Sequence, residues 1–390
     1  MSMADYCSLG FKGKYKKGNK SQEKNKNTKS NNANFNISNS NINTNHKIDL
    51  NSKYNSKYFN YYKEKNQMNS GIVNYGNNCY LNTGLQILAS CDIFVEELQK
   101  IPAHRNSLVD LIKEAFDLLQ KGHQYDPKNF IEYLSKNNTE FNLGEKNCSQ
   151  NFIRLLLNNI NNELVEKEEF CIYENNQYKP FSKSIEYIEY MKFIEENKIY
   201  PQSKLLSIFS GMSISLSTKR CEYCQNLIGN YFFNYFIDQI IYLDEIKRNC
   251  SFSDVFRKNF EESILTMNCP KCSKEIKIKE ETKIIKLPPV LIFTLERSQG
   301  NSINKVEIFP EEIIDFRKCI HPSLTLESTR YELFAINIRF GEIMGYGHAI
   351  CLVKNKGKWF EYNDLNVKAI QNCQVYNTHI YGLFYKRVGH

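Results

Sequence analysis

The stretch GIVNYGNNCYLNTGLQIL, residues 71–88, places Cys79 between a turn rich in glycine and asparagine and an apolar run. The leucines after Cys79 recur three and four residues apart, which predicts a helix that begins close to this cysteine. The first N–H groups of a helix lack intrahelical partners, and they stabilise an anion such as a thiolate or an oxyanion. The position of Cys79 therefore predicts a nucleophile, and Asn74 in the turn is a candidate for a second oxyanion donor.

The chain has 390 residues, and its two parts differ in composition. Residues 1–70 contain 16 Asn, 13 Lys, no Arg and 4 acidic residues, and they have little apolar surface to bury. We expect this segment to be a disordered tail, either without function or used for docking or localisation. The tail carries a charge of +9 and the remaining 320 residues carry −1, which gives the net charge of +8, so the body is close to neutral. A near-neutral body argues against a specific nucleic-acid partner.

The sequence also indicates in which cellular compartment the protein is expected. No apolar run reaches the roughly 18 residues that a membrane helix needs, and the first residues lack the apolar core of a signal peptide. The 13 cysteines are an odd number, which argues against a closed disulfide framework. We therefore expect a protein of the cytosol and/or nucleus, without a membrane partner, whose thiols are reduced or bind metal.

Helical patterns fill the first third of the body, and strand patterns follow. SLVDLIKEAFDLLQKG (107–122) and SQNFIRLLLNNINNELVEK (149–167) have helical spacing. Aromatic and β-branched segments then predict strands, at 230–243, 283–295, 331–340, 349–354 and 380–387. Helices followed by strands indicate an α+β body rather than repeated βαβ units.

A cysteine at a helix start is more often an inert core residue, so a nucleophile also needs a base. Of the seven histidines, His348 is the best candidate, because it follows GEIMGYG and opens a strand. HAICLVKNKGKWFEYND, residues 348–364, predicts a hairpin that turns at NKG. A turn centred between the Asn and the Lys of NKG places His348 opposite Asn363, and a three-residue turn places it opposite Asp364. Directly opposite residues share a face, so either side chain could orient the imidazole.

Four cysteines form two Cys-x2-Cys pairs with 44 residues between them, namely Cys221, Cys224, Cys269 and Cys272. Each pair can present two thiolates from one tight turn, and two such turns complete a tetrahedral zinc site. Four protein ligands leave no open position, so we expect the zinc to be structural. The alternative is a set of reduced thiols without metal.

These motifs resemble those of the ubiquitin-specific proteases, which are papain-like ubiquitin carboxyl-terminal hydrolases. GIVNYGNNCYLNTGLQIL is similar to their cysteine box, Gly-Leu-x-Asn-x-Gly-Asn-Thr-Cys-Tyr-x-Asn-x-x-Leu-Gln, and GH, KWFEYND and YGLFYKR are similar to their histidine box. The resemblance implies that Cys79 is the nucleophile, Asn74 the oxyanion asparagine and His348 the base. It further implies that Asn363 completes the triad and that Asp364 is its supporting neighbour.

The resemblance spans roughly residues 71–388 and implies an α+β, papain-like cysteine protease. Its parts would be a thumb at about 71–205, zinc-bearing fingers at about 206–285 and a β palm at about 286–388. It also implies hydrolysis of the peptide or isopeptide bond after the C-terminal glycine of ubiquitin, with ubiquitin or ubiquitinated proteins as partners. The strands between the two zinc turns would grip the globular body of ubiquitin.

The sequence departs from the family where ubiquitin's tail is held. The family's Gln-Gln-Asp-Ala-x-Glu-Phe is replaced by KNCSQNF, so Cys148 and Asn151 stand where acids help hold the basic tail of ubiquitin. The tyrosine after the histidine is Ala349, and Leu-Lys-Arg-Phe is LERS (295–298). Charge-assisted contacts are typically worth about 1.5–3 kcal/mol each. Two alternatives therefore stand beside deubiquitination: the same chemistry on a ubiquitin-like modifier, and a catalytically silent ubiquitin-binding scaffold.

Overall fold

A computed structural model describes residues 70–389, except for the segments 103–106, 138–146, 168–170, 174–183, 259, 300–301, 325–327 and 344–345. The expected disordered tail lies outside the described residues, apart from Ser70. Ser70 is buried, and its carbonyl oxygen accepts a hydrogen bond from Gln86 Nε2 at 2.9 Å. Among the described residues, no helix is both long and apolar enough to cross a membrane.

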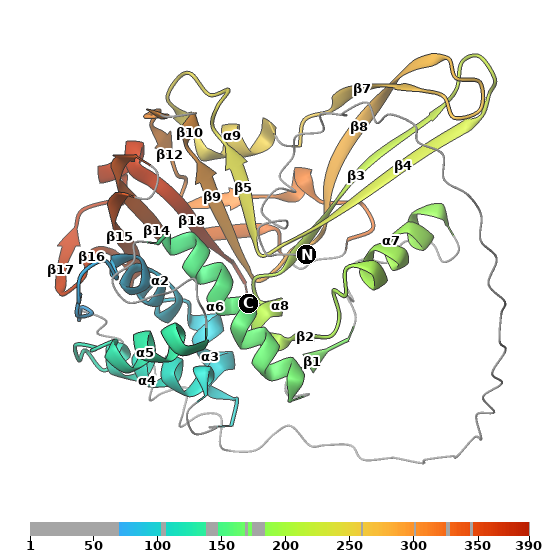
Figure 1. Ribbon diagram of the computed structural model, residues 1–390. Coiled ribbons are helices and arrows are strands. Elements are labelled where there is room, and N and C mark those ends of the chain that lie inside the picture. The colour runs from blue at the N-terminus through green and yellow to red at the C-terminus, as the bar shows by residue number, and fades with distance from the viewer. Residues whose placement is uncertain are drawn as a thin grey trace, which may run out of the picture. The chain divides into compact units, whose positions relative to one another are not determined.

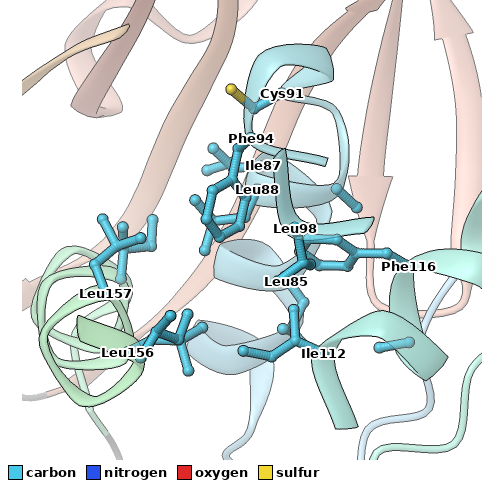
Figure 2. Packing of buried hydrophobic residues seen from close by; sticks show 14 of the residues in the cluster. Leu85, Ile87, Leu88, Cys91, Phe94, Leu98, Ile112, Phe116, Leu156 and Leu157 are labelled. Carbon is cyan, nitrogen blue, oxygen red and sulfur yellow. The ribbon is translucent and has the colours of Figure 1, made fainter. Parts of the chain in front are cut away.

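Helices dominate the first part of the described chain, as the apolar periodicity predicts. Helix α2 (Cys79–Ala89) lies at their centre, and all eleven of its residues are buried. Figure 2 shows Leu85 and Leu88 of α2 among Phe94, Phe116 and Leu156, which come from three neighbouring helices. We call this group the thumb helices: α2, α3 (Asp92–Gln99), α4 (Leu108–Gln120), α5 (Lys128–Asn137), α6 (Ser149–Glu166) and α8 (Lys204–Ser207). Because α2 is packed on every side, its N-terminus has a fixed position in the fold.

The largest sheet has eight strands, and we call it the palm sheet. Its order is β17-β16-β15-β14-β18-β9-β5, with β13 paired to β14 (Figure 1). Its strands are β5 (Asp238–Tyr242), β9 (Val290–Glu296), β13 (Ile313–Asp315), β14 (Arg330–Ile343), β15 (Tyr346–Asn355), β16 (Lys358–Asn363), β17 (Asn366–Ile370) and β18 (Ile380–Arg387). All pairs are antiparallel except β5 with β9. The strands predicted at 331–340, 349–354 and 380–387 are confirmed.

The palm sheet has an apolar core on each face, because its side chains alternate. Cys351 and Val353 of β15 belong to the core that contains the thumb helices. Ile350 and Leu352 belong to a second core, which includes residues of α9 (Phe252–Lys258). This alternation places α2 directly against β15 and so brings the start of the helix close to the start of that strand.

The second sheet, which we call the finger sheet, has four strands in the order β4-β3-β8-β7. They are β3 (Gly211–Arg220), β4 (Leu227–Phe236), β7 (Ser263–Asn268) and β8 (Glu275–Lys286), and they extend away from the palm sheet in Figure 1. Helix α7 (Ile185–Glu196) packs on β4, where Tyr190 and Phe233 place their ring centroids 5.6 Å apart.

The structure corrects three expectations for this region. The strand expected at 283–295 is divided between β8 of the finger sheet and β9 of the palm sheet. The single strand expected at 230–243 is two strands, β4 of the finger sheet and β5 of the palm sheet. Residues 238–258 fall inside the range expected for the fingers, yet β5 pairs in parallel with β9, and α9 packs in the second palm core. The physical reason is that the chain passes from Phe236 to Asp238 without a turn, so one aromatic and β-branched run serves both sheets.

Short elements connect the two sheets and the thumb helices. Three small ladders pair β1 (Cys171–Ile172) with β2 (Gln202–Ser203), β6 (Cys250–Ser251) with β12 (Ile308–Phe309), and β10 (Ser298–Gln299) with β11 (Ser302–Ile303). Two 3-10 helices are η2 (Arg317–Cys319) and η3 (Gln374–His379).

Buried polar contacts fix α6 over the palm sheet. Gln150 Nε2 donates to Thr294 Oγ1 at 3.0 Å, and the guanidinium of Arg154 donates to both oxygens of Asp238 at 2.8 Å. Bidentate pairs of this kind restrict orientation as well as distance. The contacts therefore hold the thumb helices and the palm sheet in one arrangement, with the N-terminus of α6 facing the sheet.

Candidate active site

Helix α2 begins at Cys79, as the sequence predicts. The turn before it contains Gly76 at φ 91° and Asn77 at φ 63°, both in the left-handed region. A Cβ on Gly76 would meet no atom within 4 Å, so glycine is favoured there by the backbone conformation and not by a lack of space. The N-cap residue Asn78 makes no side-chain cap bond, because its Oδ1 accepts from the backbone N of Tyr75 at 2.6 Å. The first N–H groups of α2 therefore receive no acceptor from this side chain.

His348 lies at the start of β15, and its imidazole is oriented by Asn363 at the end of β16. His348 Nε2 donates to Asn363 Oδ1 at 2.7 Å. The amide oxygen can only accept, so this bond places a hydrogen on Nε2. Nδ1 is then the ring nitrogen that can exchange a proton with Cys79, whose side chain also hydrogen-bonds the imidazole.

Both hairpin registers expected from the sequence are wrong. The turn has two residues, Lys356 and Gly357, with φ values of 48° and 77°, and the strands pair Cys351 with Tyr362. Two consecutive positive φ values are typical of a type I′ hairpin turn, whose twist matches that of the strands. In this register Asn363 is a diagonal neighbour of His348 on the same face. Diagonal neighbours are within reach of longer side chains, so the contact forms although the two residues are not directly opposite.

Asp364 contacts the loop before Cys79 and not the imidazole. It has φ 52°, and its carboxylate accepts from Asn74 Nδ2 at 2.8 Å and from Asn82 Nδ2 at 2.7 Å. Its carbonyl oxygen accepts from the backbone N of Ile72 at 3.0 Å. The side chain that orients the ring is thus Asn363, whereas Asp364 ties the segment around Asn74 to the end of β16.

Sequence reasoning missed Asn82. This side chain is 2% exposed, and besides its bond to Asp364 it accepts from Asn78 Nδ2 at 3.0 Å and donates to the carbonyl oxygen of Val73 at 3.3 Å. It lies three residues after Cys79 and hence on the same side of the helix. An amide in an otherwise apolar stretch, three residues from a suspected nucleophile, is the signal that could have found it.

The electrostatics of the site favour a protonated imidazole. The hydrogen bond with Cys79 is the largest cause that raises the pKa of His348, to about 9. Partial burial opposes this shift, and the hydrogen bond to Asn363 and the charges of Cys79 and Asp364 add to it. The ring therefore holds its proton through neutral pH and loses it as the pH rises through about 9.

This balance predicts the titration of two variants. Cys79→Ala removes the largest cause of the raised pKa, so the pKa of His348 is expected to fall from about 9 to near or below its ordinary value of 6.5. Asn363→Ala removes a smaller cause and is expected to lower it less. NMR titration of the imidazole signals measures both. A His348 pKa that does not respond to Cys79→Ala would show that the two side chains do not interact.

The four cysteines of the two Cys-x2-Cys pairs meet at the tip of the finger sheet. Their Sγ atoms all lie within 4.8 Å of one another, and the contacts Cys221–Cys272 and Cys224–Cys269 are both 3.6 Å. Tetrahedral zinc with Zn–S bonds of about 2.3 Å needs Sγ atoms roughly 3.8 Å apart. The spacing and the all-thiolate donor set therefore fit a tetrahedral metal ion.

The two turns that carry these cysteines have the same backbone geometry. In the first, Gln225 N donates to Cys221 O at 2.9 Å, and in the second, Ser273 N donates to Cys269 O at 2.8 Å. Gln225 and Ser273 both have φ 57°. Two matching turns at the ends of the β3–β4 and β7–β8 hairpins present two thiols each to one point.

The residues that depart from the family pattern lie at the start of α6 and on β15 next to His348. Cys148 is the N-cap of α6, and its side chain hydrogen-bonds Tyr381 of β18. Asn151 is exposed and accepts from Arg154 Nη1 at 3.4 Å. Ala349 is buried and pairs with Arg339 of β14. The positions of the missing acids are thus occupied by neutral side chains at the start of α6.

Comparison with known proteins shows which family this chain is similar to. Residues 70–385 match the family model described as ubiquitin carboxyl-terminal hydrolase. The chain is 27% identical to Ubiquitin carboxyl-terminal hydrolase 4 of Arabidopsis thaliana over 330 residues, which cover 78% of the chain and 86% of that protein. It is 25% identical to human Ubiquitin carboxyl-terminal hydrolase 2 over 346 residues, which cover 81% of the chain and 55% of that protein.

Solved structures of other proteins have a similar fold. The SAGA Ubp8/Sgf11/Sus1/Sgf73 DUB module bound to ubiquitin aldehyde includes a chain that superposes with a TM-score of 0.63 at 19% identity, covering 83% of this chain and 70% of that one. This likeness confirms the α+β, papain-like architecture, and the family model covers the residues of both expected boxes, because it spans residues 70–385. The chain belongs to the ubiquitin carboxyl-terminal hydrolase family.

Proposed function

We propose that this chain is a thiol-dependent deubiquitinating peptidase that hydrolyses the peptide or isopeptide bond after the C-terminal glycine of ubiquitin. The observation that carries the proposal is the hydrogen-bonded series Cys79–His348–Asn363, formed where α2 meets the palm sheet in a chain of this family. An asparagine suits a thiolate–imidazolium pair, which needs orientation of the ring more than a third charge.

The mechanism follows from the atoms at the site. The proton of the Cys79 thiol rests on His348 Nδ1 before the attack, so Cys79 Sγ attacks the carbonyl carbon of the scissile bond as a thiolate, while Asn363 holds the ring through Nε2. The carbonyl oxygen becomes an oxyanion, which the first N–H groups of α2 stabilise. His348 then gives its proton to the leaving amine, and a thioester on Cys79 remains. Water, deprotonated by His348, attacks the thioester, and Cys79 is released with the free carboxylate of the modifier.

Asn74 is the second donor to the oxyanion. Its Nδ2 carries two hydrogens, of which one bonds Asp364 Oδ2, so the other can point to the reacting oxygen. The Oδ1 of Asn74 accepts from the backbone N of Gly76 at 2.8 Å, which fixes the amide from its other end. Asp364 is therefore a positioning residue that acts through Asn74.

Asp364→Ala is expected to lower kcat by about 10²–10³-fold with little change in KM, because an oxyanion donor contributes only in the transition state. Asn74→Ala is expected to cause a loss of the same size. Steady-state kinetics of the two single variants and the double variant test the link. If Asp364 acts through Asn74, the double variant loses no more than either single one; losses that multiply would contradict the positioning role.

Zinc is the metal that the four finger cysteines fit best. Thiolates are soft ligands that select zinc, and zinc prefers the tetrahedral arrangement that four such ligands can form. Cys221, Cys224, Cys269 and Cys272 would hold it. When bound, zinc supplies a structural cross-link between the two hairpins and no Lewis-acid chemistry, since four thiolates fill its coordination sphere.

The test of the proposed function is the release of a fluorophore from the C-terminal amide of ubiquitin by the full chain. We expect turnover with ubiquitin that exceeds turnover with ubiquitin-like modifiers. The replacement of two acids by Cys148 and Asn151 favours a ubiquitin-like modifier as the second candidate. Turnover of such a modifier alone would establish that candidate, and binding of ubiquitin without turnover would establish a silent scaffold instead.

A further inference from the structure

Three amide side chains lie on one side of helix α2. Asn78 directly precedes the helix, and Asn82 and Gln86 follow at intervals of four residues, which places the three above one another. All three are buried. A buried amide is costly unless it finds hydrogen-bond partners, so the contacts of these side chains show what this side of the helix holds.

The amides hold the segment of chain that leads to the nucleophile. Asn78 Nδ2 donates to the carbonyl oxygen of Val73 at 3.1 Å, and Gln86 Nε2 donates to that of Ser70 at 2.9 Å. Later residues of the helix thus contact earlier residues of the segment. The segment therefore runs back along the helix, and the helix side chains set its position.

Asn82 is the member of this group that also contacts the palm sheet side of the site. Its Nδ2 donates to Asp364 Oδ1 at 2.7 Å and to the carbonyl oxygens of Val73 at 3.3 Å and Ile72 at 3.4 Å. Its Oδ1 accepts from Asn78 Nδ2 at 3.0 Å. The position thus needs a short side chain that both donates and accepts. An aspartate lacks the donor, and an apolar side chain lacks both groups.

The carboxylate of Asp364 is shared between Asn82 and the oxyanion donor. Its Oδ1 accepts from Asn82 Nδ2, and its Oδ2 accepts from Asn74 Nδ2 at 2.8 Å. The last torsion of an aspartate side chain is soft, so one donor leaves the carboxylate free to turn and two donors fix its plane. Without Asn82, the carboxylate would no longer hold the Asn74 amide in one direction.

Asn82 and the nucleophile belong to the same helix. Cys79 is its first residue, and one helical turn and the two hydrogen bonds through Asp364 connect this residue to the Asn74 amide. Catalytic groups must be held within about 0.5 Å of their productive geometry. So short a connection within a fully packed helix is suited to that precision.

We propose that Asn82 is a positioning residue for the reaction: it holds the Asp364 carboxylate, which in turn aims the Asn74 amide at the oxyanion. The inference rests on the proposed function and adds a buried residue to it. A donor that is already aimed at the oxyanion does not have to reorganise during the reaction, which is why such donors are effective.

Steady-state kinetics of the full chain with the fluorogenic C-terminal amide of ubiquitin test this role. Asn82→Ala is expected to lower kcat by about 10–10²-fold with KM unchanged, because the donor that it positions supplies about 10²–10³-fold and acts only in the transition state. In a chain that already carries Asn74→Ala, the same substitution is expected to lower kcat by less than about twofold. Asn161→Ala is the matched control. This asparagine of α6 accepts from the backbone N of Ser203 at 2.8 Å, and its replacement is expected to keep kcat.

An isosteric variant separates the donor from the space that the side chain fills. Asn82→Asp keeps the shape of the side chain and presents a second carboxylate to Asp364, so it is expected to lower kcat further than Asn82→Ala does. A side chain that only fills space predicts the reverse order. Thermal unfolding shows whether each variant is folded, and Asn82→Ala decides the question if Asn82→Asp does not fold.

NMR reports the position of the Asn74 amide without any substrate. Its side-chain NH₂ signals are assigned in the isotope-labelled chain by their absence in Asn74→Ala. We expect Asn82→Ala to shift these signals and Asn161→Ala to leave them unchanged.

The outcomes separate failure of this inference from failure of the proposed function. Unchanged kcat in Asn82→Ala, a loss that multiplies with that of Asn74→Ala, or an Asn74 signal that does not move would overturn the positioning role and leave the proposed function standing. No turnover of any modifier amide by the wild-type chain would overturn the proposed function and, with it, the role of Asn82 in the reaction.

Discussion

Cys79→Ala is expected to reduce the hydrolysis of ubiquitin amides to the uncatalysed background, a loss on the order of 10⁶ in kcat. No other side chain at the site can form the thioester, and the remaining oxyanion donors act only on an intermediate that Cys79 creates. The variant should still fold, because the change removes one sulfur atom at the start of a helix that is packed on every side. Steady-state release of a fluorophore from ubiquitin measures the loss.

Cys91 provides the matched control. It is a buried cysteine just after the same helix, with 0% exposure, and burial raises the pKa of its thiol to about 12. Cys91→Ala is therefore expected to keep the turnover of the wild-type chain. A Cys79→Ala variant that still turns over, or a Cys91→Ala variant that stops while folded, would contradict the assignment of the nucleophile.

Removing zinc is expected to unfold the tip of the finger sheet and leave the palm sheet folded. The buried apolar core at the tip consists of three isoleucines and two of the cysteines, namely Ile228, Ile276, Ile278, Cys221 and Cys269. So small a core cannot offset the ordering entropy of two hairpins, and zinc binding to small cysteine sites contributes apparent energies of about 10–16 kcal/mol. Cys269→Ser is expected to have the same effect as chelation.

Hydrogen exchange and metal analysis measure this effect together. We expect one zinc per chain in the wild type and in Cys250→Ser, a control outside the cluster. After chelation, exchange should accelerate in β7 and in the outer half of β8, and β14 should keep its protection. A folded chain without metal, or unchanged exchange in β7 after chelation, would show that the four thiols do not form a zinc site.

Local patterns in the sequence predict most of the fold. The leucines after Cys79 predict a helix from that residue, and the structure begins α2 there. The two Cys-x2-Cys pairs predict one cluster, and their Sγ atoms meet. In both cases the signal comes from residues close together in the chain, where spacing alone determines which side chains share a face or a turn.

Features that depend on a few dihedral angles or on distant contacts could not be predicted. The hairpin register depends on a positive φ at Lys356, which is uncommon for lysine and which no neighbouring residue demands. The bond between Asn82 and Asp364 joins residues 282 positions apart, so its existence depends on α2 packing against the palm sheet.

Covalent capture tests the central claim most directly. The full chain is treated with ubiquitin that carries a thiol-reactive electrophile in place of its C-terminal carboxylate, and the adduct is mapped by mass spectrometry. A nucleophile at Cys79, activated by His348 and reached by the tail of ubiquitin, predicts a single adduct on Cys79 among the 13 cysteines, and none in Cys79→Ala. No adduct with folded wild-type chain, or an adduct on another cysteine, would contradict the account.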